Sequence, residues 1–193
     1  WATNWGKTDM NLGQDIGSLL IQFLFSFLIV FVMLRFLLAW VRADFYNPLS
    51  QAIVSVTNPI LVPLRRVIPP IGRIDTAAIL LMLLLQAIEL TLLLLLHGRP
   101  TPVGPILLAS AVQLLRLGVW VFIAAIFIQV IVSWVAPGSR NPAAALAWSL
   151  TEPLMRPLRR VIPPFGMIDI TPMIAILLLF IGLRILDHLV GYV

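Results

Sequence analysis

Hydrophobic residues along this chain collect into four long runs, separated by short polar or proline-rich segments. A helix needs about 20 mainly apolar residues to cross the hydrocarbon core of a bilayer. The third run exceeds that length, so we expect its helix to tilt or to protrude. The predicted membrane spans are residues 16–41, 76–96, 105–135 and 170–190.

Two segments between the spans, residues 47–74 and 141–168, are too polar and too rich in proline to cross a membrane. Each begins with Asn-Pro, which predicts a helix with Asn47 or Asn141 as its N-cap and proline as its first residue. In the first segment five apolar residues share one helical face, and the second has a weaker apolar face. We therefore predict short amphipathic helices that lie in the membrane interface. The five residues are Leu49, Ala52, Ile53, Val56 and Ile60.

Prolines indicate how these two helices bend and end. Pro63 and Pro157 each disrupt a continuous helix, so we expect a bend or two short helices in each segment. Each segment then reaches Pro-Pro and a glycine that permits a tight turn. The turn residues are Pro69, Pro70 and Gly72 in the first segment and Pro163, Pro164 and Gly166 in the second.

The chain repeats itself without a gap at a shift of 94 residues, which places Asn141 on Asn47. Between Pro63 and Asp75, eleven of the thirteen positions are identical in the second copy. Each copy contains two spans, an even number, so both copies enter the membrane from the same side. The copies are therefore parallel repeats, related by an axis along the membrane normal, rather than inverted ones.

We predict an all-α membrane protein with four transmembrane helices, arranged as these two parallel repeats, residues 10–98 and 99–193. Residues 1–9 are set apart as a non-native or flexible start, because Met10 stands just before the first hydrophobic run.

Composition agrees with a protein that is solvated by lipid. Hydrophobic residues make up 61% of the chain and charged residues only 11%, with no cysteine, whereas soluble domains carry about 25% charged residues. Disulfides and thiolate chemistry are thereby excluded. The net charge of +5 comes mainly from arginines beside the spans, so it predicts contact with lipid headgroups rather than with nucleic acid.

The arginines also predict an orientation. The loops after the first and third spans carry four arginines each, whereas the connection between the second and third spans carries Arg99. Because positively charged loops stay in the cytoplasm, both repeat loops are expected there and both termini outside.

The doubled motif Asn-Pro…Pro-Leu-Arg-Arg-Val-Ile-Pro-Pro-x-Gly-x-Ile-Asp, in a four-span chain, resembles the YggT family, whose plastid relatives are named YlmG. The resemblance covers about residues 11–193, with Glu152 in place of Asn58 as a departure. It implies an inner-membrane protein in bacteria, tied to osmotic tolerance and cell division, and in plastids a link to nucleoid distribution and cytochrome maturation. These associations imply a scaffolding or assembly role, and they bring no catalytic residues to carry over.

Two arginine pairs are the first candidate site, Arg65-Arg66 and Arg159-Arg160. Guanidinium groups bind phosphate and carboxylate groups through two parallel hydrogen bonds. The pairs are candidates for binding an anionic lipid or an acidic partner, and the alternative is that they only set topology and snorkel to headgroups. Asp75 and Asp169 precede the second and fourth spans, where each is expected to cap a helix, to pair with the arginines of its own repeat, or both.

Charged residues within the spans form the second candidate. Glu89 and Arg116 lie at matching depths in neighbouring spans, and a charge in hydrocarbon costs about 2.5–3.5 kcal/mol on insertion scales. We therefore predict that they form an intramembrane ion pair, which either fixes the helix bundle or contributes to an ion path. The isolated histidines, His97 and His188, give little reason to predict a metal site or a cofactor.

The sequence favours a non-enzymatic membrane scaffold or an accessory subunit of a larger membrane complex or homo-oligomer. The alternative is a small channel or transporter component linked to osmotic or ion balance. An enzyme is disfavoured, since no nucleotide-binding loop or catalytic set is present in the sequence.

Overall fold

The computed structural model describes the chain except for residues 1–4, 73, 100–101, 137–140, 163–168 and 191–193. The described residues form six α-helices and an isolated antiparallel bridge between Ile71 and Ile74. The helices are α1 (Trp5–Trp40), α2 (Pro48–Val67), α3 (Thr76–Leu96), α4 (Val103–Val135), α5 (Pro142–Val161) and α6 (Thr171–Val190).

Four of these helices are long and apolar enough to cross a membrane, and they agree with the four predicted spans within a few residues. They contain Leu12–Trp40, Thr76–Leu96, Val103–Val135 and Thr171–His188. These four helices indicate a multi-pass membrane protein. The α1 helix already begins at Trp5, so residues 5–9, which the sequence led us to set apart, continue the first helix.

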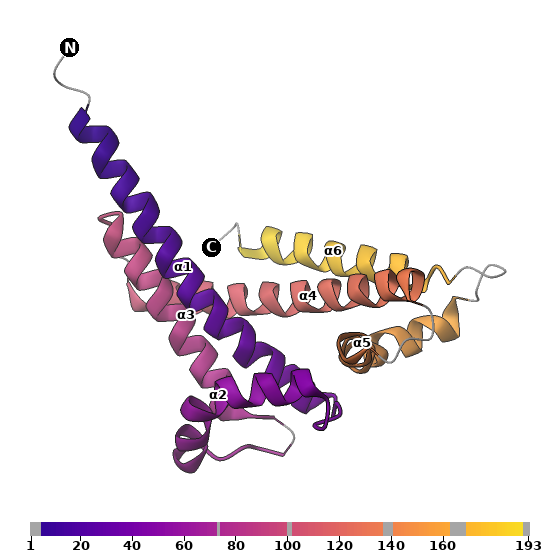
Figure 1. Ribbon diagram of the computed structural model, residues 1–193. Helices are drawn as coiled ribbons and strands as arrows, with labels where there is room; N and C mark the ends of the chain where they lie inside the picture. Colours follow the sequence, from indigo (N-terminus) through magenta and orange to yellow (C-terminus); the bar gives the residue numbers. More distant parts are fainter. Residues whose placement is uncertain (1–4, 73, 100–101, 137–140, 163–168, 191–193) are drawn as a thin grey trace.

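Each repeat folds as a hairpin of two long helices with a shorter helix at one end (Figure 1). In the first repeat α1 and α3 lie side by side and antiparallel, and Gln14 near the start of α1 donates a hydrogen bond to the carbonyl of Leu96 at the end of α3. In the second repeat α4 and α6 pair in the same way. The second hairpin runs across the first in Figure 1 rather than alongside it.

The largest hydrophobic core joins the two repeats. It combines residues of α1 and α3 with Leu114 and Ala125 of α4 and with Ala147 and Leu150 of α5. Elsewhere, large apolar side chains stay exposed along all four long helices, as expected of surfaces that face lipid rather than water. The hairpins are therefore held together by a shared core, not only by the connection between α3 and α4.

Both shorter helices tolerate prolines in their interiors. The α2 helix contains Pro59 and Pro63, and α5 contains Pro153 and Pro157. Neither helix is broken into two, but each changes direction along its length in Figure 1. A proline removes one helical hydrogen bond and pushes against the preceding turn, which bends the helix.

The predicted apolar face of α2 is not the face that packs against the protein. Leu49, Val56 and Ile60 are exposed, each by 40% or more, and Ile53 is the buried member of that set. The packed face instead consists of Ser50, Ile53, Thr57 and Leu61. The helix therefore has one face against the long helices and, beside it, an apolar face that is largely exposed.

Candidate functional site

Each shorter helix begins with the cap that Asn-Pro encodes. The side-chain oxygen of Asn47 accepts a hydrogen bond from the backbone N–H of Leu49, and Asn141 accepts one from Ala143, both at 2.9 Å. These bonds satisfy backbone donors that a helix start would otherwise leave unpaired. Asn47 also donates to the carbonyl of Pro142 at 2.8 Å, which links the start of α2 to the start of α5.

The first repeat turns sharply between α2 and α3, and Arg65 and Asp75 clamp this turn. One carboxylate oxygen of Asp75 forms an ion pair with Arg65, and the other accepts from the N–H of Ala78 at 3.2 Å, capping α3. We call this clamped turn the first elbow. Asp75 therefore has both roles considered for it, cap and ion-pair partner, and it joins the end of α2 to the start of α3.

The chain inside the first elbow is tightly turned. Gly72 has a φ of +62°, a conformation that glycine adopts without strain, and the bridge between Ile71 and Ile74 closes around it. The carbonyl of Pro69 accepts a hydrogen bond from the hydroxyl of Thr76 at 2.7 Å, and Pro70 is exposed. Of the corresponding residues of the second repeat, Pro163, Pro164 and Gly166 lie outside the described part of the chain.

The second repeat has the equivalent clamp, which we call the second elbow, between Arg159 and Asp169. Their side chains approach to 3.3 Å, and Asp169 also accepts from the N–H of Thr171 at 2.9 Å. Arg159 has two further contacts: the carboxylate of Glu152 at 3.5 Å and the ring of Trp148, whose centre is 4.9 Å from the guanidinium carbon. A cation over an indole face is attracted by the ring's electron density.

The contacts of Asp169 change its acidity. Burial alone would raise the pKa of this carboxyl, but hydrogen bonds from Thr171 and the charge of Arg159 outweigh burial and hold the pKa below its usual range. The ionised form is therefore the form that holds the second elbow.

The two arginines of each pair have different surroundings. Arg65 and Arg159 are half-buried and clamp their elbows, whereas Arg66 and Arg160 are exposed at the neighbouring position. Arg66 and Arg160 directly follow the clamped residues, in the last turns of α2 and α5. Of the four arginines predicted to bind a lipid or a partner, Arg66 and Arg160 are thus the exposed ones, and Arg65 and Arg159 are engaged in ion pairs.

Arg35, which lies within the first predicted span, is buried against α2. It is only 9% exposed and donates to the Thr57 hydroxyl and the Asn58 side-chain oxygen, both at 2.7 Å, and to the carbonyl of Val54 at 3.1 Å. All three acceptors belong to α2. Sequence reasoning missed this role because it did not place α2 back against α1.

The second repeat replaces this arginine with a neutral group. Shifting Arg35 by 94 residues gives Gln129, whose side-chain oxygen accepts from the hydroxyl of Thr151 at 3.2 Å. Thr151 is the equivalent of Thr57, and both threonines are buried. Each repeat thus docks its shorter helix through a buried threonine, with a cation in the first repeat and an amide in the second.

The predicted ion pair between Glu89 and Arg116 needs correction. Arg116 pairs with Asp187 of α6 at 2.6 Å, and Glu89 accepts from the side-chain amide of Gln86 at 3.0 Å. Gln86 also donates to the side-chain oxygen of Gln113 on α4 at 2.7 Å. The sequence-based pairing failed because it compared depths in α3 and α4 only, and α6 brings a closer carboxylate to Arg116.

Glu89 and Arg116 nevertheless line one cavity of about 320 Å³ between α1, α3 and α4. Its polar wall also includes Ser26, Gln86 and Gln113. Glu89 is buried, and the Nε atom of Arg116 is buried without a hydrogen-bond partner. A membrane protein that holds carboxylate, guanidinium and amide groups in one cavity can stabilise a small polar guest or a structural water.

Comparison with known proteins agrees with this doubled architecture. The model of the CCB3/YggT family matches residues 15–96 and again residues 108–190, one match for each repeat. A Pseudomonas aeruginosa relative named "Uncharacterized protein PA0392" is 44% identical over 173 residues, which cover 89% of this chain and 86% of the relative.

Two further relatives come from other bacteria. The Vibrio alginolyticus "Uncharacterized protein in proC 3'region" is 38% identical, over 90% of this chain and 92% of its own length. The Escherichia coli K12 "Uncharacterized protein YggT" is 40% identical over 78% of both chains. No solved structure matches the chain. With both repeats matched, the chain belongs to the CCB3/YggT family.

Proposed function

We propose that this protein is a non-enzymatic scaffold of a bacterial inner membrane, which holds anionic lipids at its two elbows and serves a larger membrane complex as an assembly or accessory subunit. The observation that carries the proposal is the doubled elbow, which clamps one arginine and leaves its neighbour, Arg66 or Arg160, exposed. A cation in the last turn of a helix is already held near one place, which lowers the entropy cost of binding a phosphate group.

The shorter helices support a position at the membrane interface. The exposed apolar face of α2, with Leu49, Val56 and Ile60, suits burial among lipid headgroups and the upper acyl chains. The exposed arginines at its end then reach the phosphate layer. Because four arginines follow each of α1 and α4 along the chain, we place both elbows on the cytoplasmic side and both termini outside.

A lipid experiment tests the elbows. The protein, purified in mild detergent from a membrane with phosphatidylglycerol, is analysed by native mass spectrometry for retained lipid. We expect the wild type to retain phosphatidylglycerol in preference to phosphatidylcholine, and the Arg66→Gln/Arg160→Gln variant to lose that preference. Arg99→Gln, which removes one cation between α3 and α4, is the matched control. Equal retention in all three proteins would contradict the lipid proposal.

A second experiment tests the scaffold role. The tagged protein is isolated in mild detergent from its native membrane, and co-purifying subunits are identified by mass spectrometry. We expect a defined set of membrane subunits in constant ratio, reduced in the double arginine variant at unchanged expression. Recovery of the tagged chain without any such set would count against the scaffold.

The polar cavity favours a second candidate function, a small channel or transporter component. Glu89, Arg116 and the two glutamines that line it are the kinds of groups found along ion pathways. Purified protein in liposomes provides the test, with flux of protons, potassium and sodium measured across the bilayer. Flux that Glu89→Gln abolishes would favour the channel over the scaffold.

A further inference from the structure

The two repeats meet where α3 packs against α4. Gln86 and Gln113 form a hydrogen bond across this contact, and further along Thr91 of α3 and Ile106 of α4 line one small cavity. The two helices run antiparallel from their short connection. The contact therefore pairs the last helix of one repeat with the first helix of the next.

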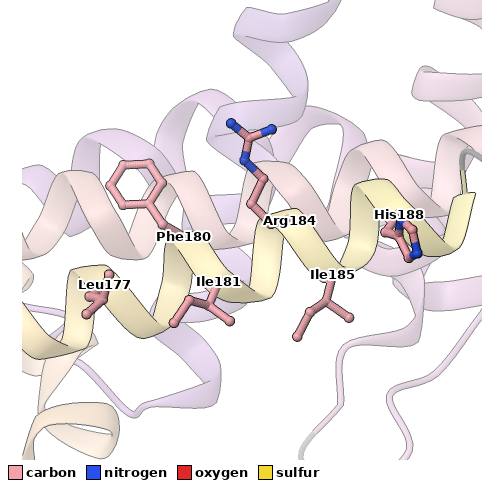
Figure 2. Close-up of a pocket in the computed structure, with 6 residues that line it drawn as sticks. All are labelled: Leu177, Phe180, Ile181, Arg184, Ile185 and His188. Carbon is pink, nitrogen blue, oxygen red and sulfur yellow. The ribbon is translucent and has the colours of Figure 1, made fainter.

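The residues of α3 that form this contact have equivalents in the second repeat, on α6. A shift of 94 residues takes Leu83, Gln86, Ala87 and Thr91 of α3 to Leu177, Phe180, Ile181 and Ile185. Figure 2 shows these four α6 side chains along a shallow open pocket together with Arg184 and His188. The α3 residues are buried or half-buried, whereas the four α6 residues are 41% to 57% exposed.

The α4 side of the contact has an equivalent on α1. The same shift takes Ser110, Gln113, Leu114 and Leu117 of α4 to Ile16, Leu19, Leu20 and Phe23. The α4 residues are again buried or half-buried, and the α1 residues are 49% to 75% exposed. Both halves of the contact between repeats thus recur as exposed apolar faces, one on α1 and one on α6.

Charge agrees with this match. Because α3 and α4 are antiparallel, a step forward along α3 corresponds to an equal step back along α4. Gln86 lies level with Gln113, so Leu90, four residues further on, lies level with Ala109, four residues earlier. Their equivalents are Arg184 on α6 and Asp15 on α1, which are residues of opposite charge and are both exposed. A contact built like the one between α3 and α4 would bring these two charges to the same level.

We propose that the exposed face of α1 in one copy of this protein packs into the α6 pocket of a second copy, repeating the contact between α3 and α4. The interface is head-to-tail. In a dimer it forms twice: α1 of the first copy contacts α6 of the second, and α1 of the second contacts α6 of the first. The two copies thus make a closed ring of four repeats. Closure covers both apolar faces of each copy, as a closed assembly requires. This interface does not depend on the proposed lipid binding at the elbows.

Cysteine cross-linking tests the interface directly, because the native chain has no cysteine. Two differently tagged chains, Leu19→Cys and Phe180→Cys, are co-expressed, and their membranes are oxidised with copper phenanthroline. Since each chain carries one cysteine, a disulfide between the two tags joins two copies. We expect this product in high yield, and also from Leu12→Cys with Ile185→Cys, which copies the proximity of Ile106 to Thr91.

Leu178→Cys is the matched control, since it is 47% exposed on α6 but does not line the pocket. We expect at least a tenfold lower yield of the mixed product with Leu19→Cys. Equal yields from the control and the Phe180→Cys chain, or no mixed product from either test pair, would overturn the proposal.

A second experiment exchanges the two charges and counts the copies in each complex within a lipid bilayer, without cross-linking. Single-molecule photobleaching counts the labelled copies in each complex. At the same protein density in the bilayer, the wild type should bleach in two steps and Arg184→Asp mostly in one. The Asp15→Arg/Arg184→Asp variant should restore two steps. One-step bleaching of the wild type, or a double variant as disrupted as the single one, would overturn the ring.

Discussion

Gln86 donates its side-chain amide to Gln113 at 2.7 Å and thereby joins the last long helix of the first repeat to the first long helix of the second. Hydrogen bonds between membrane helices contribute about 0.6–2 kcal/mol. At the equivalent positions of the outer helices the chain has Phe180 and Leu19 instead. At this level the helices that join the two repeats, α3 and α4, therefore have polar residues, whereas the equivalent positions of α6 and α1 are apolar.

This difference gives a first prediction. Gln113→Leu leaves the amide of Gln86 with Glu89 as its remaining partner, and we expect a loss of about 1 kcal/mol in unfolding free energy. Gln86→Leu should cost more, because Glu89 then also loses its donor. A double-mutant cycle, measured by steric trapping or by unfolding in mixed micelles, should give a coupling energy of at least about 0.5 kcal/mol. Strict additivity would show that the bond contributes nothing.

A second prediction concerns the pairing of Arg116. Because its carboxylate partner is Asp187 at 2.6 Å, Arg116→Gln and Asp187→Asn should be non-additive, with the double variant close to the worse single one. Glu89→Gln combined with Arg116→Gln should show a smaller coupling, because these two residues line one cavity but do not form an ion pair with each other. The same unfolding assay distinguishes the two cases. Coupling to Glu89 that exceeds coupling to Asp187 would restore the pairing inferred from depth alone.

A third prediction concerns Arg35. Arg35→Leu removes three hydrogen bonds that hold α2 against α1 and should cost about 1.5–3 kcal/mol, with faster proteolysis within α2. Arg35→Gln copies the residue that the second repeat uses, Gln129 with Thr151, and should be milder than Arg35→Leu. Thermal unfolding in detergent measures both. Equal losses would mean that the cation, and not the hydrogen bond to threonine, docks the helix.

A fourth prediction follows from the lowered pKa of Asp169. A carboxyl whose pKa is lower in the folded than in the unfolded chain stabilises the fold above its unfolded pKa of about 3.9 and loses that contribution as pH falls through the folded value. Asp169→Asn should therefore lower the unfolding temperature at pH 7. The gap from wild type should narrow only below about pH 4. A gap that stayed constant down to pH 2 would contradict the role of the ionised form.

A fifth prediction separates the two arginines of one pair. Arg65→Gln should destabilise the protein, because Asp75 loses its ion-pair partner at the turn into α3. Arg66→Gln should leave the unfolding temperature within about 1 °C of wild type, as exposed surface changes usually do, while it lowers retention of phosphatidylglycerol. Native mass spectrometry and thermal unfolding on the same samples provide both readouts. Equal destabilisation by the two changes would remove the division of roles.

Local patterns made much of the fold predictable. The lengths of the apolar runs gave the four spans, and Asn-Pro gave the starts of α2 and α5, because these depend on neighbouring residues alone. The clamp between Arg65 and Asp75 was foreseen as one of two roles for the aspartate, since both residues lie in one short turn.

Contacts between helices were harder to predict. The sequence does not say which face of a uniformly apolar helix meets its neighbour, so the partner of Arg116 was misassigned. The buried Arg35 was missed for a related reason: its acceptors lie on α2, and the face of α2 that packs against α1 lies beside the predicted apolar face. The periodicity of α2 indicated a face suited to lipid, and it could not reveal the second face that packs.

The contacts of Arg35 bear on how the protein is made. Its acceptors follow it by 19 to 23 residues, so they leave the ribosome soon after the first span and before α3. Until they arrive, a guanidinium in hydrocarbon has no protein partner, and once they arrive α2 can fold back at once. The turn that places α2 against α1 can therefore form during synthesis, while the second repeat is still being translated.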